Sequence, residues 1–306
     1  MTVESVIGNI VRLGVHVEAL AALGAALRLQ HSGAHSDPRV CGSLQRVIHA
    51  IDPRLVENDA LTDGRDSAAV IQTVFRQSIE LLENPERSPG WRHEDPAMLQ
   101  SQGQMSRHII HSIDALADQC PGLRATLRRP GTLLDVGTGT GWLAIEAVRI
   151  WPALRVVGID VWEPALAIAR KNVEQSQFAQ RIELRSQAVE QLADSSAYAV
   201  AYFPGSFIAS EITLTALDQI YQALEPAGWL VFALWTASED SLAAAVANLR
   251  IVRSGGHPWT SAEAENLLGT VGFERIKVLP ADTTGSPISF VVARRPGESA
   301  PSSRHA

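Results

Sequence analysis

The sequence predicts an α/β fold: a doubly wound, mostly parallel seven-stranded sheet with an antiparallel terminal hairpin, preceded by an all-helical N-terminal subdomain. From Gly131 onward, apolar runs of strand type alternate with helical patterns, as in a parallel sheet covered on both faces. Only residues 281–287 join the last two runs. This connection is too short for a crossover helix, so these strands should be antiparallel. Before residue 130 no segment carries a clear strand pattern.

The first third of the chain carries three helical patterns. Residues 3–29 have apolar side chains at three- and four-residue steps, namely Ile7, Ile10, Leu13, Val17, Leu20, Leu23 and Leu27. A shorter pattern with Leu44, Val47, Ile48 and Ile51 ends at Asp52-Pro53, and a third covers residues 66–82. An apolar stripe has to pack against another element, within its own domain or in a second copy of the chain. We therefore expect residues 1–94 to form a helical cap or dimerisation subdomain.

Residues 84–96 resemble a linker, with three prolines in a short stretch. Trp91 is unexpected in a free linker, because a large aromatic side chain usually packs. Asp95-Pro96 is typical of a helix start, with an N-cap followed by proline at the first helical position. The helical pattern that follows has Leu99, Met105, Ile109, Ile113 and Leu116 as its apolar positions. A break at Gly103 would not be surprising, since glycine weakens a helix.

The second domain is expected over residues 95–295. Its strands are predicted at Thr132–Val136, Arg155–Asp160, Ile182–Arg185, Tyr198–Phe203, Trp229–Leu234, Phe273–Leu279 and Ile288–Arg294. Helices are predicted from near Gly141, over Pro164–Ser176, over Leu214–Leu224 and over Ser261–Val271. A turn at Pro226-Ala227-Gly228 should precede the fifth strand. The Pro/Ser-rich residues 296–306 are expected to form a disordered tail.

A glycine-rich turn follows the first predicted strand. An apolar run ends at Asp135, and Gly137, Gly139 and Gly141 then allow the backbone to turn sharply and a ligand to approach the main chain. The spacing is G-x-G-x-G, and Trp142 stands where dinucleotide-binding proteins of type G-x-G-x-x-G have their third glycine. A carboxylate beside the loop disfavours a pyrophosphate and favours a ligand with an ammonium group.

A second acidic residue ends the next strand. Asp160 lies about 20 residues past the loop, where adenosine-binding α/β folds place the carboxylate that holds the ribose hydroxyls. The alternative is that the glycines form an ordinary tight turn and that Asp160 caps a helix. Turn chemistry alone does not require both features at this spacing.

Together, Asp135-Val-Gly-Thr-Gly-Thr-Gly141 and Val156–Asp160 resemble the first two motifs of class I S-adenosylmethionine-dependent methyltransferases. The resemblance covers about residues 95–295. It implies that the cofactor is S-adenosyl-L-methionine. Its methionine portion would lie against the loop of Gly137, Thr138, Gly139 and Gly141, and Asp160 would bind its ribose.

The resemblance also implies an adenine site. Val161 and Trp162 would lie beside the adenine and ribose, and the fourth strand would bring Phe203 to the same cleft. Many family members have an acidic residue after the third strand, where this chain has Ser186 and Gln187. The adenine contact therefore departs from the family pattern, with Gln187 and the main-chain amide of Ala188 as candidates.

The implied activity is methyl transfer to a small-molecule acceptor by in-line displacement, with O-methylation slightly favoured over N- or C-methylation. The segment Tyr202–Phe207 is not the Asn/Asp-Pro-Pro-Tyr/Phe motif of nucleic-acid aminomethylases. Two alternatives are kept. An NAD(P)-dependent oxidoreductase is opposed by Asp135, Trp142 and the predicted hairpin. A non-catalytic S-adenosylmethionine-binding protein of the same fold would keep both motifs.

A hydroxyl acceptor would benefit from a general base. His108 and His111 precede the cofactor motifs and share a helix face, so they are candidates, although a surface or hydrogen-bonding role is favoured for each taken singly. Arg107 could pair with the cofactor carboxylate. Glu211 and His257 are further candidates. The histidines and Cys120 lack metal-ligand spacing, so no metal is expected.

The composition excludes several classes of protein. The 306-residue chain is 46% hydrophobic and 19% charged, as in soluble globular proteins. Its net charge of −7 and its lack of basic runs argue against nucleic acid as a partner. Its two cysteines indicate no disulfide framework. The apolar N-terminus is interrupted by charges, so we expect neither a signal peptide nor a membrane span, and a cytoplasmic location.

Overall fold

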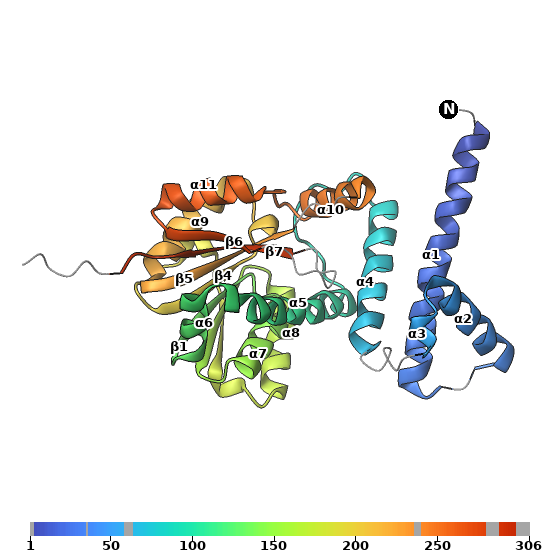
Figure 1. The fold of residues 1–306 in the computed structure, drawn as a ribbon, viewed down its shortest axis with the longest axis horizontal. Helices are drawn as coiled ribbons and strands as arrows, with labels where there is room; N and C mark the ends of the chain where they lie inside the picture. The colour runs from blue at the N-terminus through green and yellow to red at the C-terminus, as the bar shows by residue number, and fades with distance from the viewer. Residues whose placement is uncertain (1–2, 35, 58–63, 236–239, 280–287, 298–306) are drawn as a thin grey trace, which may run out of the picture. The chain divides into compact units, whose positions relative to one another are not determined.

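The computed structural model describes residues 3–34, 36–57, 64–235, 240–279 and 288–297. The chain divides into two compact units, Met1–Glu86 and Arg87–Ala306 (Figure 1). Each unit has its own hydrophobic core. The expected domain boundary at residue 94 falls in the segment between the last helix of the first unit and the first helix of the second. The expected 281–287 connection and residues 298–306 of the expected tail lie outside the described residues.

The first unit is helical, with α1 (Val3–Ser32), α2 (Pro38–Ile51), α3 (Arg54–Glu57) and α4 (Gly64–Glu83). Its core is formed by Leu27 and Ile71, with Ala68 beside them. Helices α1 and α4 meet closely at Gly24, where an added Cβ would lie 2.9 Å from Ile71 Cγ2. The C-terminal half of the α1 apolar stripe therefore packs within the unit.

Helix α1 corrects one expectation. Its segment Ser5–Ser32 is long and apolar enough to cross a membrane, with a mean hydropathy of 1.6, so the expectation of no segment of that length was wrong. The charged residues counted as interruptions, such as Arg12 and Glu18, do not break the helix. Core helices of soluble proteins and N-terminal signal sequences have the same length and composition, but only 11% of this apolar window is buried.

The second unit is built on one seven-stranded sheet with the order β3-β2-β1-β4-β5-β7-β6. The strands are β1 (Gly131–Val136), β2 (Leu154–Asp160), β3 (Ile182–Ser186), β4 (Tyr198–Phe203), β5 (Leu224–Trp235), β6 (Glu274–Leu279) and β7 (Ile288–Arg294). The first five pair in parallel, whereas β7 is antiparallel to both β5 and β6. The predicted mixed sheet with its antiparallel ending is confirmed.

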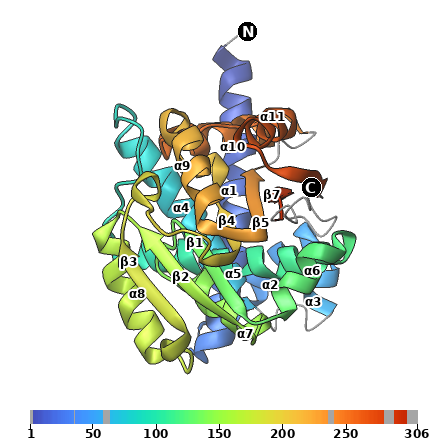
Figure 2. The same cartoon turned by 90° about the vertical axis from the view of Figure 1, so that its left-hand side faces the viewer.

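Helices cover both faces of this sheet (Figure 2). The helices of this unit are α5 (Pro96–Leu116), α6 (Pro121–Arg128), α7 (Trp142–Ile150), α8 (Glu163–Gln175), α9 (Ser210–Ala223), α10 (Ser241–Arg253) and α11 (Ser261–Val271). Side chains alternate along each strand, so Leu133 of β1 packs with α5, α6 and α7, and its neighbour Leu134 packs with α9 and α11. The two layers leave the carboxyl ends of β1, β2 and β4 together at one edge.

Two local predictions were wrong. Helix α5 runs through Gly103 without a break. Glycine is needed there because the helix approaches the glycine-rich loop, and an added Cβ would lie 1.8 Å from Thr140 Oγ1. The predicted turn at residues 226–228 is instead an irregularity within a long β5, where the pairing with β4 shifts and Ala227 has a φ of +67°.

Candidate functional site

The glycine-rich loop connects β1 to α7. Gly137, Gly139 and Gly141 all have positive φ angles, of 68°, 57° and 79°, which side chains rarely adopt. At Gly139 an added Cβ would meet only Gly137 O, at 3.9 Å, so the backbone conformation and not crowding requires glycine there. The loop therefore leaves its main chain open to a ligand, as the sequence predicts.

Asp135 lies fully buried at the end of β1. Its Oδ2 accepts a 2.7 Å hydrogen bond from Thr138 Oγ1, and within the described residues its Oδ1 has no partner. Burial raises the pKa of Asp135 to about 7 against the effect of Thr138, and the charge of Asp160 adds to the rise. A buried carboxylate oxygen without a partner is costly. It is suited to a cation, and the ammonium group of S-adenosylmethionine fits this requirement.

Asp160 at the end of β2 is bonded directly to the glycine-rich loop. Its Oδ2 accepts from the Gly139 N–H and its Oδ1 from the Trp162 N–H, both at 2.8 Å. Burial raises the pKa of Asp160, whereas the main-chain donors of Trp162, Gly139 and Val161 lower it. A carboxylate has about four acceptor sites, more than these donors occupy. Asp160 can therefore hold the loop and still accept hydrogen bonds from ribose hydroxyls.

The predicted adenine residues lie at the same edge, with one exception. The main-chain N–H of Gln187 donates to Asp160 O at 2.9 Å, Ala188 follows it, and Val161 is 68% exposed. The ring of Phe203, in contrast, is fully buried against Phe232 on the α9 and α11 side of the sheet. Its side chain is a core residue, and only its main chain lies at the strand end.

An amide network that the sequence analysis missed supports the glycine-rich loop. Trp142 Nε1 donates to Gln100 Oε1 at 2.7 Å, and Gln100 Nε2 donates to Asn172 Oδ1 at 2.8 Å. Asn172 Nδ2 in turn donates to the loop carbonyl of Thr140 at 2.8 Å. The unusual Trp142 was the only sequence signal of this network, because its partners come from α5 and α8.

The histidines proposed from α5 lie elsewhere. His111 Nε2 is 2.7 Å from Glu146 Oε1, on the second turn of α7, and Arg107 Nε is 3.4 Å from the other oxygen. Burial alone would raise the pKa of Glu146, but hydrogen bonds from Arg149 and His111 and the charge of Arg107 lower it to about 2. His108 is exposed on the same helix. The structure brings neither histidine to Asp135 or Asp160.

Aromatic side chains gather beyond the ends of β4 and β5. Phe207 and Trp235 meet edge to face at 5.6 Å, and Ser206 Oγ accepts from the Trp235 N–H at 2.9 Å. Next to this turn, the rings of His257 and Trp259 lie 4.3 Å apart, and the buried indole nitrogen of Trp259 has no partner among the described residues.

The turns that carry these rings lie along the same edge of the sheet as the glycine-rich loop. Gly256 packs directly on the β4 turn, since an added Cβ would lie 2.0 Å from Ser206 O. The same turn reaches the loop, because a Cβ on Gly137 would lie 3.5 Å from Pro204 Cγ. Of the candidates His108, His111 and His257, only His257 therefore lies at the carboxyl edge.

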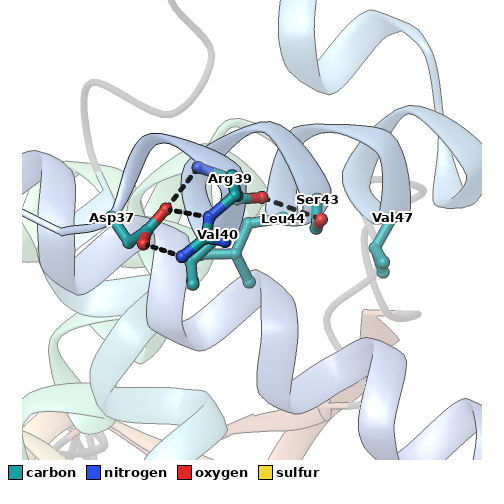
Figure 3. Close-up of a pocket in the computed structure, with 6 residues that line it drawn as sticks. All are labelled: Asp37, Arg39, Val40, Ser43, Leu44 and Val47. Carbon is teal, nitrogen blue, oxygen red and sulfur yellow. Dashed lines mark hydrogen bonds and ion pairs between the residues drawn. The ribbon is translucent and has the colours of Figure 1, made fainter.

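Among the described residues, no group of three or more His, Cys, Asp or Glu side chains could hold a metal ion. A hollow of about 460 Å³ lies on α2 in the first unit (Figure 3). It is lined by Asp37, Arg39, Val40, Ser43, Leu44 and Val47, and Arg39 is paired with Asp37 at 2.7 Å. None of these residues belongs to the two motifs.

Fold and site together are those of a class I S-adenosylmethionine-dependent methyltransferase. A family model described as a methyltransferase domain matches residues 101–278, more than half of the chain. The chain belongs to this methyltransferase domain family.

Curated relatives match over shorter stretches. The ribosomal protein L11 methyltransferase of Citrifermentans bemidjiense is 29% identical over 126 residues, 41% of this chain and 39% of the relative. The demethylmenaquinone methyltransferase of Thermus thermophilus is 34% identical over 113 residues, 34% of this chain and 47% of the relative. The chain thus spans less than half the length of these relatives.

Solved structures match nearly the whole chain at low identity. An O-methyltransferase family protein from Burkholderia thailandensis has a TM-score of 0.66 at 13% identity, over 96% of this chain and 99% of that one. Human N-acetylserotonin methyltransferase, in complex with SAM, has a TM-score of 0.59 at 15% identity, over 97% and 99%. At these identities the likeness establishes the fold.

Proposed function

We propose that this protein transfers the methyl group of S-adenosylmethionine to a hydroxyl group on a small aromatic molecule. The observation that carries the cofactor assignment is the buried, unpartnered Oδ1 of Asp135 beside an open glycine-rich loop. Two carboxylates at this edge, Asp135 and Asp160, would repel the pyrophosphate of a dinucleotide and attract a ligand with a positive charge. The site thus supports S-adenosylmethionine over NAD(P).

Each residue would have a distinct task. Asp135 would bind the ammonium group, Asp160 the ribose hydroxyls, and the open main chain at Gly137 and Gly139 would lie against the methionine portion. The bound cofactor supplies a methyl group that its sulfonium already activates. The protein has to orient the acceptor and exclude water.

The acceptor assignment is supported by the aromatic cluster of Phe207, Trp235, His257 and Trp259. Pockets for small molecules are lined mostly by apolar and aromatic side chains with a few polar groups. The unpartnered indole N–H of Trp259 would donate a hydrogen bond to an acceptor oxygen, and His257 is the proposed general base. The names of the full-length structural neighbours favour O-methylation, whereas the protein-modifying relatives match only part of the chain.

Titration calorimetry of the purified protein with S-adenosylmethionine, S-adenosylhomocysteine and NADH tests the cofactor assignment. We expect micromolar binding of the first two and none of NADH. Release of S-adenosylhomocysteine is then measured with a panel of phenols. Binding of NADH alone would overturn the proposal, and cofactor binding without turnover on any acceptor would favour a non-catalytic binding protein.

We also propose that the protein is a cytoplasmic homodimer joined through α1. The N-terminal half of this helix exposes Ile7, Ile10, Val11, Leu13, Val15 and Val17, each by at least 50%. An exposed apolar run of this kind is typical of an interface. A second copy of the helix offers a matching apolar surface, and the charges of Arg12 and Glu18 would oppose burial in a bilayer.

A further inference from the structure

The segment Arg87–Asp95, which precedes α5, contains no helix or strand but is anchored at two points. At the first, the Gly90 N–H donates to Arg253 O at 3.0 Å, at the end of α10, while Arg87 donates to Gly90 O at 2.7 Å. At the second, Trp162 Nε1 donates to His93 O at 2.7 Å. This segment contains the tryptophan, Trp91, that is unexpected in a linker.

The two anchors lie at the ends of different strands. Trp162 follows β2, whereas Arg253 is close to Gly256, which packs on the turn after β4. Strand β1 lies between β2 and β4. Since neighbouring strands are about 4.8 Å apart, the ends of β2 and β4 are separated by about 10 Å. The residues Gly90–His93, which carry both anchors, can span about that distance when extended.

Residues 91 and 92 therefore lead from the β4 side of this edge to the β2 side, with β1 between the two. At the first anchor, the backbone of Gly90 packs closely against that of Gly255. Gly90 and Gly255 have φ angles of +141° and +83°, and a Cβ on Gly255 would lie 3.1 Å from Gly90 Cα. The ring of Trp91 meets that of His93 edge to face at 5.2 Å and is only partly exposed.

We propose that residues Arg87–Asp95 form a strap that closes the outer side of the cofactor site, with the hydrogen bond from Trp162 to His93 as its latch. This inference rests on the proposed function, since it places the cofactor between the glycine-rich loop and the strap. The cofactor then enters and leaves only when the strap opens. The latch and the Gly90–Gly255 contact set how often it opens.

The test is to measure the association and dissociation rates of S-adenosylhomocysteine by surface plasmon resonance. Trp162→Phe keeps a ring but removes the latch donor, and we expect it to raise the dissociation rate about fivefold, as for the loss of one hydrogen bond. The matched control is Trp151→Phe. It removes an indole donor of the same kind, 2.9 Å from Asp114 Oδ1 at the far end of α7, and should leave both rates unchanged.

A second pair of variants tests the other anchor without touching Trp162. Gly255→Ala should also raise the dissociation rate, because its new Cβ would push against Gly90. Gly272→Ala has a similar backbone cost, with φ +102°, but its nearest neighbour is Tyr221 at 3.8 Å, so its rates should stay those of the wild type. Hydrogen exchange of residues 88–95 should slow when S-adenosylhomocysteine is bound and quicken in Trp162→Phe.

The outcomes separate the two proposals. A wild-type protein that does not bind S-adenosylhomocysteine overturns the proposed function and the strap together. Wild-type binding with the rates of Trp162→Phe and Gly255→Ala equal to those of their controls overturns the strap alone. An effect of Trp162→Phe without one of Gly255→Ala also overturns it, because Trp162 would then act directly on the cofactor.

Discussion

The main-chain N–H of Gly139 donates a 2.8 Å hydrogen bond to Oδ2 of Asp160. This contact joins the glycine-rich loop of β1 to the acid of β2 in the protein's own structure. Loop and carboxylate therefore need little rearrangement when a ligand arrives, which lowers the cost of binding.

Gly139→Val should abolish cofactor binding, because a β-branched residue is strongly disfavoured at φ +57°. Asp160→Ala should weaken binding by about 10- to 100-fold, since it removes both the ribose acceptor and the anchor of the loop. Calorimetry measures the affinity and circular dichroism checks the fold. Unchanged affinity in both folded variants would exclude this edge as the cofactor site.

Asp135 should make the protein less stable at alkaline pH. Its pKa rises from 3.8 to about 7 on folding, which corresponds to ~4 kcal/mol. The contribution of Asp135 to the free energy of unfolding is complete below pH 4 and is lost as pH rises through 7. Urea unfolding of wild type and Asp135→Asn at pH 4.5 and pH 8 measures the difference. The free energy of unfolding of the variant should increase relative to that of the wild type as pH rises. A difference that is the same at both pH values would contradict the burial of this carboxyl group.

Asp135→Asn should also lose affinity for S-adenosylmethionine, although it is expected to be the more stable protein above pH 7. In the wild type, binding should strengthen about tenfold per pH unit up to pH 7, because the ammonium group requires the ionised carboxylate. Calorimetry across this range detects the accompanying proton release. Asp160→Asn serves as the comparison for a general loss of charge at the same edge.

Kinetic assays should distinguish the roles of His257 and His111. His257→Ala should lower kcat about 100-fold with little change in KM for the cofactor, as for loss of a general base. His111→Ala removes one partner of the buried Glu146, so it should lower stability by ~1 kcal/mol after allowance for solvent screening and leave kcat unchanged. Equal kcat in wild type and His257→Ala would remove His257 from the mechanism.

Substitution by alanine should have opposite effects on stability at two helical glycines. Gly103→Ala in α5 should destabilise the protein by about 1–3 kcal/mol and weaken cofactor binding, since its Cβ would meet Thr140 of the loop. Gly269→Ala in α11 has only Ile276 Cδ1 within reach, at 3.9 Å, and should stabilise by up to ~1 kcal/mol. Thermal unfolding with and without S-adenosylhomocysteine compares them. A stabilising Gly103→Ala would contradict the close contact between α5 and the loop.

The proposed dimer depends on the exposed half of α1. Ile10→Asp places a charge on a side chain that is 62% exposed, so the monomer should fold while the dimer dissociates. Light scattering after size-exclusion chromatography gives the mass of each. A monomeric wild type, or one found in the membrane fraction of cells, would overturn the homodimer.

The sequence predicted the strands of the second unit to within one residue, except for the start of β5, because buried parallel strands carry dense local apolar patterns. Helix α6 and helix α10 were not predicted. Helix α6 has only eight residues, and α10 has a single buried side chain, Ile251, so neither presents a long apolar stripe.

The residues of the site also divide into those that the sequence could predict and those that it could not. Asp135, Gly139 and Asp160 could be predicted because their spacing along the chain carries the chemistry. The partners of Glu146, the amide network around Trp142 and the ring of Phe203 depend on which helix packs against which face. No local pattern specifies that packing. Trp91 was recognised as unusual, but its neighbours could come only from the folded chain.

The position of β7 has a consequence for how the protein is made. This strand is the last in the sequence, yet it lies between β5 and β6 and pairs with both. During synthesis β6 emerges from the ribosome with no neighbour in the sheet, and β5 keeps an open apolar edge until residues 288–294 arrive. A chain truncated before β7 would therefore keep the unpaired apolar edge of β5. Such a fragment would aggregate or bind chaperones and would not fold as a smaller functional domain.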